Sequence, residues 1–350
     1  KKLFMKTLSY KKIRNFIYKN FSLIGLNHID CEYVTDGIVN ASLRGVDSHG
    51  IRLFRHYILS GINGRKAINP KYNFIKNYKT SLLLDANNGY GLAACRRALE
   101  KSLTIVDKYG MANVAVVNSS HCGCLASSVI PIVRKGYIVF GFTHADSLLL
   151  SYGSSKSYFG TNPLCFGYPR KNKEPFCLDM SPSLFSWNKV LSYRIQNKKL
   201  PKNICADESG RMTTNPHKAK SLIPIGGYKG YGMSAMIEIL CSINIGMNFG
   251  KKIPPMFTWD IKKPRNLGQF FIIMKSDLHV NNSLASRNLE NLYKDIYKLP
   301  KLKKSQNVYL PNDKETITFE QRKKNGIPIT KEIKEDFKYV SSILDTDCIF

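Results

Sequence analysis

The stretch between residues 81 and 118 limits the possible folds most, because it alternates the two kinds of secondary structure. Ser81–Asp85 is a short apolar run typical of a strand, Leu92–Tyr109 has the pattern of a helix, and Asn113–Asn118 is again strand-like. Further strands are predicted later in the chain, at Ile138–Thr143, Pro163–Tyr168, Phe176–Met180 and Phe270–Lys275. Strands that alternate with helices indicate an α/β fold.

Helices are predicted at both ends of the chain. Residues 9–62 read as an opening amphipathic helix, a second helix from Asp30 to Leu43, and a third after His49. The other end has two helical segments, Thr316–Lys324 and Lys331–Leu344. Between the ends, Leu125–Lys135 reads as a helix although Pro131 falls inside it, and Met233–Met247 as an apolar helix opened by a glycine-rich turn. The Pro-rich stretch from about 250 to 266 is expected to be a loop.

Chain length and cysteine content indicate a globular protein in a reducing compartment. The chain has 350 residues, 43% of them hydrophobic, which is enough for a substantial core in two domains or one lobed unit. It lacks the run of about 18 apolar residues that a membrane span needs. Nine scattered cysteines favour a reducing compartment, so we expect a cytoplasmic protein. Import into an organelle is the alternative, because the first acidic residue is Asp30, but apolar residues recur at helical spacing before it.

The net charge of +28 could indicate a nucleic-acid partner. However, the excess Lys is spread along the chain, and the clusters at 301–304 and 322–324 are short and lack interleaved aromatic residues. We therefore expect neither a nucleic acid nor a membrane as partner. A positive field would attract a small anionic substrate and a dinucleotide.

Two histidines lie in similar settings. His49 follows Ser48 and precedes Gly50, and His121 lies in Ser-His-Cys-Gly. Glycine allows a backbone or a ligand to approach closely, and imidazole transfers protons near neutral pH. A purely structural role is the alternative for each histidine. A metal is not expected, because His121, Cys122 and Cys124 supply too few well-spaced ligands.

The turn before the predicted helix at 92 offers a second interpretation. Residues 88–94 read Asn-Gly-Tyr-Gly-Leu-Ala-Ala, which fits the G-x-G-x-x-A pattern of a Rossmann dinucleotide site. The next strand should then end in Asp or Glu, which binds the ribose, but Asn118 and Ser119 stand there instead. A tight turn that requires glycine is the favoured interpretation.

Five short blocks carry a resemblance to a known family. They are residues 44–50 (Arg-Gly-Val-Asp-Ser-His-Gly), 118–123 (Asn-Ser-Ser-His-Cys-Gly), 160–163 (Gly-Thr-Asn-Pro), 178–181 (Leu-Asp-Met-Ser) and 226–232 (Gly-Gly-Tyr-Lys-Gly-Tyr-Gly). In this order and at these separations, the blocks resemble the malate/L-lactate dehydrogenase family, which includes ureidoglycolate, sulfolactate and diketogulonate oxidoreductases. The resemblance runs from about residue 10 to about residue 345.

The resemblance implies an L-sulfolactate dehydrogenase-like α/β fold: a mixed β-sheet with flanking helices, not a Rossmann fold, and a helical domain built from both chain termini. The domain boundaries expected on this basis are 1–75 for the first helical part, 76–265 for the cofactor-binding α/β domain, and 266–350 for the last strand and the returning helices. The family also implies a homodimer.

The activity implied is hydride exchange between NAD(P)H and a small 2-oxo or 2-hydroxy acid, malate- or lactate-like, with NAD favoured over NADP. His49 is similar to the family's proton donor, His121 is its rival for that role, and Ser48 would orient the imidazole. Two alternatives remain open: reduction of a cyclic imine or a diketo sugar acid in the same pocket, and a catalytically idle relative that binds the cofactor.

Substrate-binding residues are less well defined. Relatives place an arginine four residues after the histidine, where this chain has Leu53; Arg52 stands one residue earlier. A carboxylate is best held by the planar guanidinium of Arg. Arg52, Tyr57 and Thr161 are therefore the candidates for substrate contacts.

The cofactor site implied by the resemblance comes from four parts of the chain. Asp179, Met180 and Ser181 would contact the ribose side, and Lys229 and Gly230 the phosphates. His144 replaces an asparagine of the family, and Asn162 lies at the turn before Pro163. The family's Pro-Gly-Glu is Pro-Asn-Asp here, where Asn312 can adopt the left-handed backbone that Gly would.

Overall fold

A mixed sheet of seven strands forms the centre of the molecule in the computed structural model, which describes residues 6–258 and 261–350. The strand order is β2-β3-β4-β10-β5-β6-β7. β3 and β4 are parallel, and every other neighbouring pair is antiparallel. The prediction of an α/β fold with a mixed sheet is confirmed. The bounds are β2 Asn73–Tyr78, β3 Ser81–Asp85, β4 Met111–Ser119, β5 Tyr137–Thr143, β6 Leu164–Tyr168, β7 Phe176–Met180 and β10 Leu267–Lys275.

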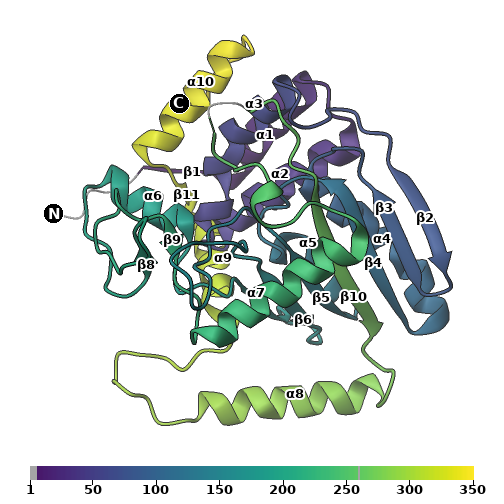
Figure 1. The fold of residues 1–350 in the computed structure, drawn as a ribbon. Coiled ribbons are helices and arrows are strands. Elements are labelled where there is room, and N and C mark those ends of the chain that lie inside the picture. The colour runs from purple at the N-terminus through teal and green to yellow at the C-terminus, as the bar shows by residue number, and fades with distance from the viewer. Residues whose placement is uncertain (1–5, 259–260) are drawn as a thin grey trace.

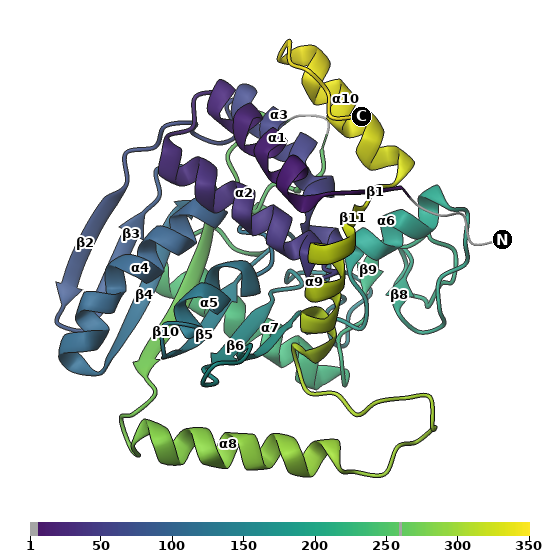
Figure 2. The same ribbon diagram turned by 180° about the vertical axis from the view of Figure 1, so that it is seen from behind.

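Helices cover both faces of this sheet. α4 (Gly91–Tyr109) and α5 (Ala126–Val133) lie on one face and α7 (Tyr228–Cys241) on the other, as the two opposite views show (Figures 1 and 2). Successive side chains of a strand point to opposite faces, so each face needs its own apolar cover. Leu99 of α4 belongs to the apolar cluster of the first face, and Ile237 of α7 to that of the second.

Helices from both ends of the chain share one core. Phe16 of α1 (Tyr10–Leu23) stacks on Phe337 of α10 (Lys331–Ile343), with ring centroids 5.1 Å apart, and Phe54 of α3 (Phe54–Ile62) lies at the same distance from Phe337. α2 (His28–Leu43) contributes Val34 and Ile38 to this cluster. The two chain ends therefore pack as predicted, while the domain boundaries at 75 and 265 stay predictions.

Several elements were not predicted from the sequence: β2, α6 (Trp187–Ile195) and α8 (Asn282–Tyr297). α8 runs along one side of the molecule, away from the central sheet (Figures 1 and 2), and Tyr293 is its one buried residue. The smaller elements are α9 Asp313–Asn325, the strands β1 Thr7–Leu8, β8 Cys205–Ala206, β9 Ser221–Leu222 and β11 Ile327–Pro328, and the 3₁₀-helices η1 Asp47–His49, η2 Ile51–Leu53, η3 Ile243–Ile245 and η4 Gly250–Lys252.

The helix predicted at Met233–Met247 was wrong at both ends. α7 starts five residues earlier in the chain, at Tyr228, and ends at Cys241. Gly226 and Gly227 have φ of +57° and +61°, which stops any helix before them and lets one begin directly after. Ser242 leaves the helical region with φ of −133°, so the apolar residues that follow form the separate turn η3. Lys229 therefore lies in the first turn of α7.

The glycine turn before α4 packs against the protein. The backbone N–H of Gly91 donates to Oγ of Ser120 at 2.9 Å, and a Cβ at Gly91 would lie 2.2 Å from the carbonyl oxygen of Ser120. Gly91 is thus required for close packing, and its N–H is already used. The interpretation as a tight turn is favoured over a Rossmann pyrophosphate site.

Candidate active site

His49 and His121 lie face to face. Their ring centroids are 5.6 Å apart and the ring planes are within 14° of parallel. His49 ends η1, just after α2, and His121 follows the end of β4. The fold thus brings the two Ser-His segments, which are far apart in the sequence, together at one site. Both histidines are half-buried.

The orientation of His49 is fixed by Ser48, and its pKa is set mainly by burial. Oγ of Ser48 lies 2.9 Å from Nδ1 of His49, and the side chain of Asn188 in α6 donates to the carbonyl oxygen of Ser48 at 2.9 Å. Burial lowers the pKa of His49 to about 4, and the nearby charge of Arg52 acts in the same direction. Gly50 serves packing, because a Cβ there would lie 2.1 Å from Oγ of Ser42 on α2.

His121 is held by a tyrosine and a backbone amide. The hydroxyl of Tyr57 lies 2.6 Å from Nδ1 of His121, and the N–H of Gly123 donates to the same nitrogen at 3.3 Å. Burial first, and then the charges of His49, Arg265 and Lys66, hold the pKa of His121 well below its ordinary value. Both imidazoles are therefore neutral at neutral pH in the free protein.

Of the predicted substrate-binding residues, Tyr57 and Arg52 act directly on the stacked histidines His49 and His121. Tyr57 contacts His121 directly, and Arg52 is close enough to affect the pKa of His49. Arg55 points elsewhere: it forms an ion pair with Asp336 at 3.0 Å and stacks on Tyr339 of α10. Thr161 lies half-buried in the loop before β6. Of Arg52 and Arg55, Arg52 is thus the one whose charge acts on His49.

The predicted ribose-side residues lie next to the glycine-rich turn. The carboxylate of Asp179, at the end of β7, accepts the N–H of Ala126 at 2.8 Å. Burial raises the pKa of Asp179 to about 6. After Met180 and Ser181, the carbonyl oxygen of Pro182 accepts the N–H of Ile225 at 3.0 Å, which joins this segment to the turn.

The start of α7 offers groups that suit phosphate. Lys229 is exposed in its first turn, and a Cβ at Gly227 would meet no atom within 4 Å. A helix N-terminus with a cation and open space beside it favours an anion. Gly230 instead packs tightly, because a Cβ there would lie 2.4 Å from the carbonyl oxygen of Ile225. The start of α7 therefore fits the phosphates of a dinucleotide.

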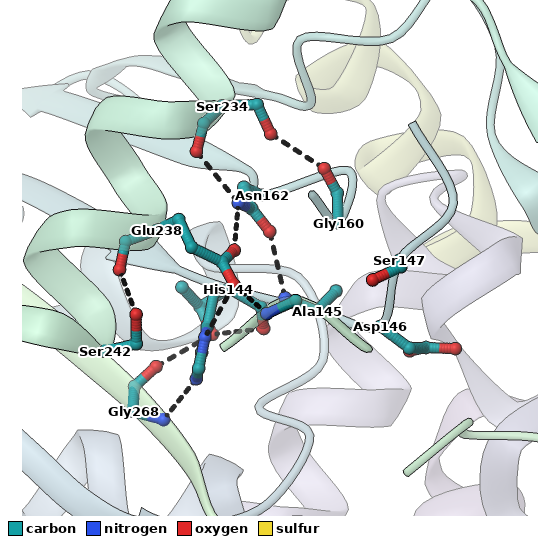
Figure 3. A network of polar contacts seen from close by, with 12 residues as sticks. His144, Ala145, Asp146, Ser147, Gly160, Asn162, Ser234, Glu238, Ser242 and Gly268 are labelled. Atoms are coloured by element: carbon teal, nitrogen blue, oxygen red, sulfur yellow. Dashed lines mark hydrogen bonds and ion pairs between the residues drawn. The ribbon is translucent and has the colours of Figure 1, made fainter. Parts of the chain in front are cut away.

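His144 and Asn162 belong to a buried polar network (Figure 3). The amide of Asn162 donates to the carbonyl oxygen of Ser234 at 2.9 Å and to the carboxylate of Glu238 at 2.6 Å, and its oxygen accepts the N–H of Ala145 at 3.0 Å. Nε2 of His144 accepts the N–H of Gly268 at 2.8 Å. The two side chains hold residues 144–147 against α7 and β10, and a direct contact with the cofactor stays a prediction.

Asn312 adopts the predicted left-handed backbone, with φ of +78°, directly before α9. Its side chain accepts from Arg44 at 3.0 Å and donates to the carbonyl oxygen of Pro175 at 2.8 Å. It lines a cavity of about 550 Å³ together with Arg170 and Tyr309. Neither histidine of the stacked pair lines that cavity, so the cofactor contact predicted for Asn312 stays a prediction.

Two cationic residues beside the histidines were missed from the sequence. Lys66 and Arg265 are each 3% exposed, and each affects the pKa of His121. Nothing in the sequence distinguishes them, because the chain has 53 Lys and Arg residues and both positions lie in loops. Only the folded chain brings residue 265 next to residue 66.

Within residues 6–258 and 261–350, no group of three or more His, Cys, Asp or Glu side chains could hold a metal ion. No helix of this part of the chain has the length and apolar character that crossing a membrane requires.

Comparisons with known proteins show the family and the fold of the chain. The family model described as malate/L-lactate dehydrogenase matches residues 8–338. The chain is 27% identical over 326 residues to ureidoglycolate dehydrogenase (NAD(+)) of Escherichia coli O157:H7, covering 93% of each chain. It is 26% identical over 340 residues to malate dehydrogenase of Pyrococcus horikoshii, covering 94% of this chain and 93% of that one.

Solved structures show the same fold. Malate dehydrogenase from Entamoeba histolytica superposes with a TM-score of 0.92 at 25% identity, covering 99% of this chain and 100% of that one. Sulfolactate dehydrogenase from Methanocaldococcus jannaschii superposes with a TM-score of 0.89 at 24% identity, covering 98% of each. The predicted class of protein, a nicotinamide-dependent oxidoreductase, and the predicted family are confirmed: the chain belongs to the malate/L-lactate dehydrogenase family.

Proposed function

We propose that the protein interconverts a small 2-oxo acid and the corresponding 2-hydroxy acid with NAD(H) or NADP(H), NAD being favoured. The observation that carries the proposal is the stacked pair of neutral imidazoles, His49 and His121. One relative is named as an NAD(+) enzyme and another, a sulfolactate dehydrogenase, as an NADP(+) enzyme.

His49 is the residue that gains and loses the proton. The hydroxyl of Ser48 can rotate, so it can donate to Nδ1 of His49 or accept from it, and both protonation states are satisfied. Nδ1 of His121 instead accepts a fixed backbone N–H from Gly123, which would be lost if that nitrogen were protonated. His121 therefore stays neutral, with its proton on Nε2, and donates a hydrogen bond to the substrate oxygen.

The direction of proton transfer follows from these charges. When bound, the nicotinamide supplies or accepts the hydride. During oxidation, the neutral His49 takes the hydroxyl proton of the 2-hydroxy acid. During reduction, His49 must first become protonated and then gives its proton to the carbonyl oxygen. An anionic substrate promotes that protonation, because its charge offsets that of Arg52, which adds to burial in lowering the pKa of His49.

The remaining roles are part of the same proposal. Arg52 binds the carboxylate next to the reacting carbon, Tyr57 orients His121, and Thr161 shapes the pocket. Asp179, Met180 and Ser181 contact the ribose side, and Lys229 meets phosphate. The proposed compartment is the cytoplasm, since all nine cysteines are free.

The proposed assembly is a homodimer. Met236 and Ile239, on the outer side of α7, are 45% and 55% exposed, and Ile243 just after the helix is 55% exposed. A second copy would cover such apolar side chains.

The test is the oxidation of NADH and NADPH by the purified protein with pyruvate, oxaloacetate and a cyclic imine. We expect turnover with a 2-oxo acid and a loss of ~10²–10⁴-fold in rate for His49→Ala, the usual loss when a general acid is removed. His217→Ala, at an exposed position, is the matched control. Turnover of the imine alone would identify the other reductase class. Cofactor binding without any turnover would identify an idle relative.

A further inference from the structure

The cavity of about 550 Å³ beside Asn312 lies where the chain returns from α8 to α9. The segment between these two helices leaves the body of the molecule and comes back to it, as the two opposite views show (Figures 1 and 2). Residues between β6 and β7, Arg170 and Pro175 among them, line the cavity as well. Pockets that hold small organic ligands have volumes of about 300–1,000 Å³.

The cavity lies on the outer face of α9. Asp313, Thr316 and Ile317 line it, and residues three or four apart share one face of a helix. Arg322 belongs to the opposite face, where it donates to the carboxylate of Asp47 at 3.0 Å. Asp47 is the first residue of η1, the turn that carries one of the two stacked histidines. The cavity and the histidine pair therefore lie on opposite sides of α9.

Three cationic side chains line the cavity: Arg170, Lys173 and Lys301. Arg170 and Lys173 both form ion pairs with Glu290, at 2.8 and 2.6 Å, so one carboxylate faces two positive charges. Nζ of Lys301 donates to the amide oxygen of Asn307 at 3.0 Å, a neutral partner that leaves the charge of the lysine uncompensated. An excess of positive charge in a concave place attracts an anion.

The acidic residues of the lining do not cancel this excess. Glu174 is bound by two arginines, Arg44 at 2.7 Å and Arg134. The carboxylate of Asp313 accepts the hydroxyl of Tyr297 at 2.9 Å and a backbone N–H at 2.7 Å. The cations of the lining and of these ion pairs thus outnumber the carboxylates.

The rest of the lining is apolar and aromatic. Pro175, Val308 and Ile317 contribute apolar side chains, and Tyr297 and Tyr309 contribute rings. Ile317 and the two tyrosines are each 40–45% exposed. Covering such surface with an apolar ligand is favourable, and a flat ring stacks well on tyrosine.

We propose that this cavity binds a small anion that carries an aromatic ring, independently of the nicotinamide cofactor. The acidic group of the ligand pairs with the cations of the lining, chiefly Lys301, and its ring packs against Tyr297 and Tyr309. The ligand class is thus an aryl phosphate or an aromatic carboxylic acid. This inference does not rest on the function proposed above.

The first experiment compares the two parts of such a ligand. Isothermal titration calorimetry, with NADH at saturation, measures the Kd of phenyl phosphate, inorganic phosphate and benzyl alcohol. We expect phenyl phosphate to bind with a Kd below about 1 mM, and the other two at least about 10-fold more weakly, because each lacks one part. Benzoate in place of phenyl phosphate decides between a carboxylate and a phosphate. Equal affinity for phenyl phosphate and inorganic phosphate would overturn the proposal.

The second experiment locates the binding site. Lys301→Met removes a charge of the lining and Tyr309→Ala removes a ring, and both residues are exposed, so the fold is kept. Lys303→Met and Tyr78→Ala are the matched controls, at exposed positions outside the lining. We expect each lining variant to bind phenyl phosphate about 5- to 10-fold more weakly and the controls to bind it as the wild type does. Unchanged binding in both lining variants would show that the cavity is not the site.

The third experiment separates the cavity from the cofactor site. The titration with phenyl phosphate is repeated without NADH, and we expect the same Kd, because α9 lies between the cavity and the histidine pair. Stronger binding without NADH would show that the two ligands compete and that the cavity is part of the cofactor site, which would overturn the proposal. If NADH itself does not bind but both lining variants lose phenyl phosphate, this inference stands and the proposed function fails.

Discussion

The hydroxyl of Tyr57 lies 2.6 Å from Nδ1 of His121, and this contact fixes how the second histidine presents its other nitrogen. Tyr57 is fully buried on α3, whose position is set by the core that joins both chain ends. The orientation of His121 is thus determined by packing far from the reacting atoms.

Tyr57→Phe removes that hydroxyl and keeps the ring. We expect kcat/KM to fall about 5- to 10-fold and the free energy of unfolding to fall by about 1 kcal/mol, the usual contribution of one hydrogen bond. Steady-state kinetics and urea denaturation measure the two effects. Tyr18→Phe is the matched control, because the Tyr18 hydroxyl makes the same 2.6 Å contact with exposed His28. Equal kinetic losses in both variants would contradict the proposed role.

Asp179→Asn tests the ribose-side contact. The Asn oxygen can still accept the N–H of Ala126, so the fold is kept, but a charged acceptor for the cofactor hydroxyls is lost. We expect NADH to bind about 10-fold more weakly in a fluorescence titration. Asp277→Asn, at an exposed turn, serves as control.

The same variant carries a pH test. Because the pKa of Asp179 is raised to about 6, protonation below that pH removes the charge in the wild type. NADH affinity should therefore fall in the wild type as the pH drops through about 6, and stay flat in Asp179→Asn. Parallel pH profiles for the two proteins would show that Asp179 does not contact the cofactor.

Stability should depend on pH through His49 of the site and through His56, a histidine of α3. Burial lowers the pKa of His49 to about 4 and that of His56 to about 3, from an ordinary value of 6.5. Between these values and 6.5 the unfolded chain binds more protons than the folded one, so stability falls as the pH falls below 6.5. Asp179, with its raised pKa, acts in the opposite direction between its ordinary value of 3.8 and about 6.

The contribution of His49 is isolated by comparison with His49→Gln. We expect the thermal midpoint of the variant to fall less than that of the wild type between pH 7 and pH 5, because the variant has no imidazole to charge. Differential scanning calorimetry at each pH measures the difference. An identical pH dependence in both proteins would show that His49 is not shielded from water.

The network around Asn162 should be a major source of local stability. Asn162→Ala deletes three hydrogen bonds and leaves the N–H of Ala145 and the carboxylate of Glu238 without those partners in a buried place (Figure 3). We expect a loss of about 2–4 kcal/mol in the free energy of unfolding by urea denaturation. Asn63→Ala, at an exposed position, should cost far less. A loss no greater than that of the control would mean that other groups replace these bonds.

Much of the sheet could be predicted because its strands are short apolar runs with clear ends. β3, β5 and β7 lie close to the residues that the periodicity indicates. α8 was missed although Leu289, Tyr293 and Ile296 recur at helical spacing, and in the fold Tyr293 is its one buried residue. The start of α7 was missed because Gly230 and Gly232 read as a turn, whereas the positive φ of Gly226 and Gly227 makes the turn before them.

The two histidines of the site could be found from their sequence settings, but not the cations around them. Lys66 and Arg265 are nearly 200 residues apart, and only the packing of the loop after α3 against the loop before β10 brings them together. Arg65 takes part in that packing by donating to the carbonyl oxygen of Met256 at 2.9 Å. Contacts between residues so far apart in the chain cannot be predicted from the local sequence pattern or from the spacing of motifs.

The place of β10 in the sheet has a consequence for how the protein is made. β10 lies between β4 and β5, although residues 144–266 separate it from β5 in the chain. A nascent chain that has emerged only to residue 266 therefore has two strand groups, β2-β3-β4 and β5-β6-β7, with no strand to join them. Each group has an unpaired edge at that stage, and such edges are prone to association with other chains. Assembly of the catalytic pocket is thus a late event in biosynthesis, and the growing polypeptide needs protection until the nine residues of β10 have been synthesised.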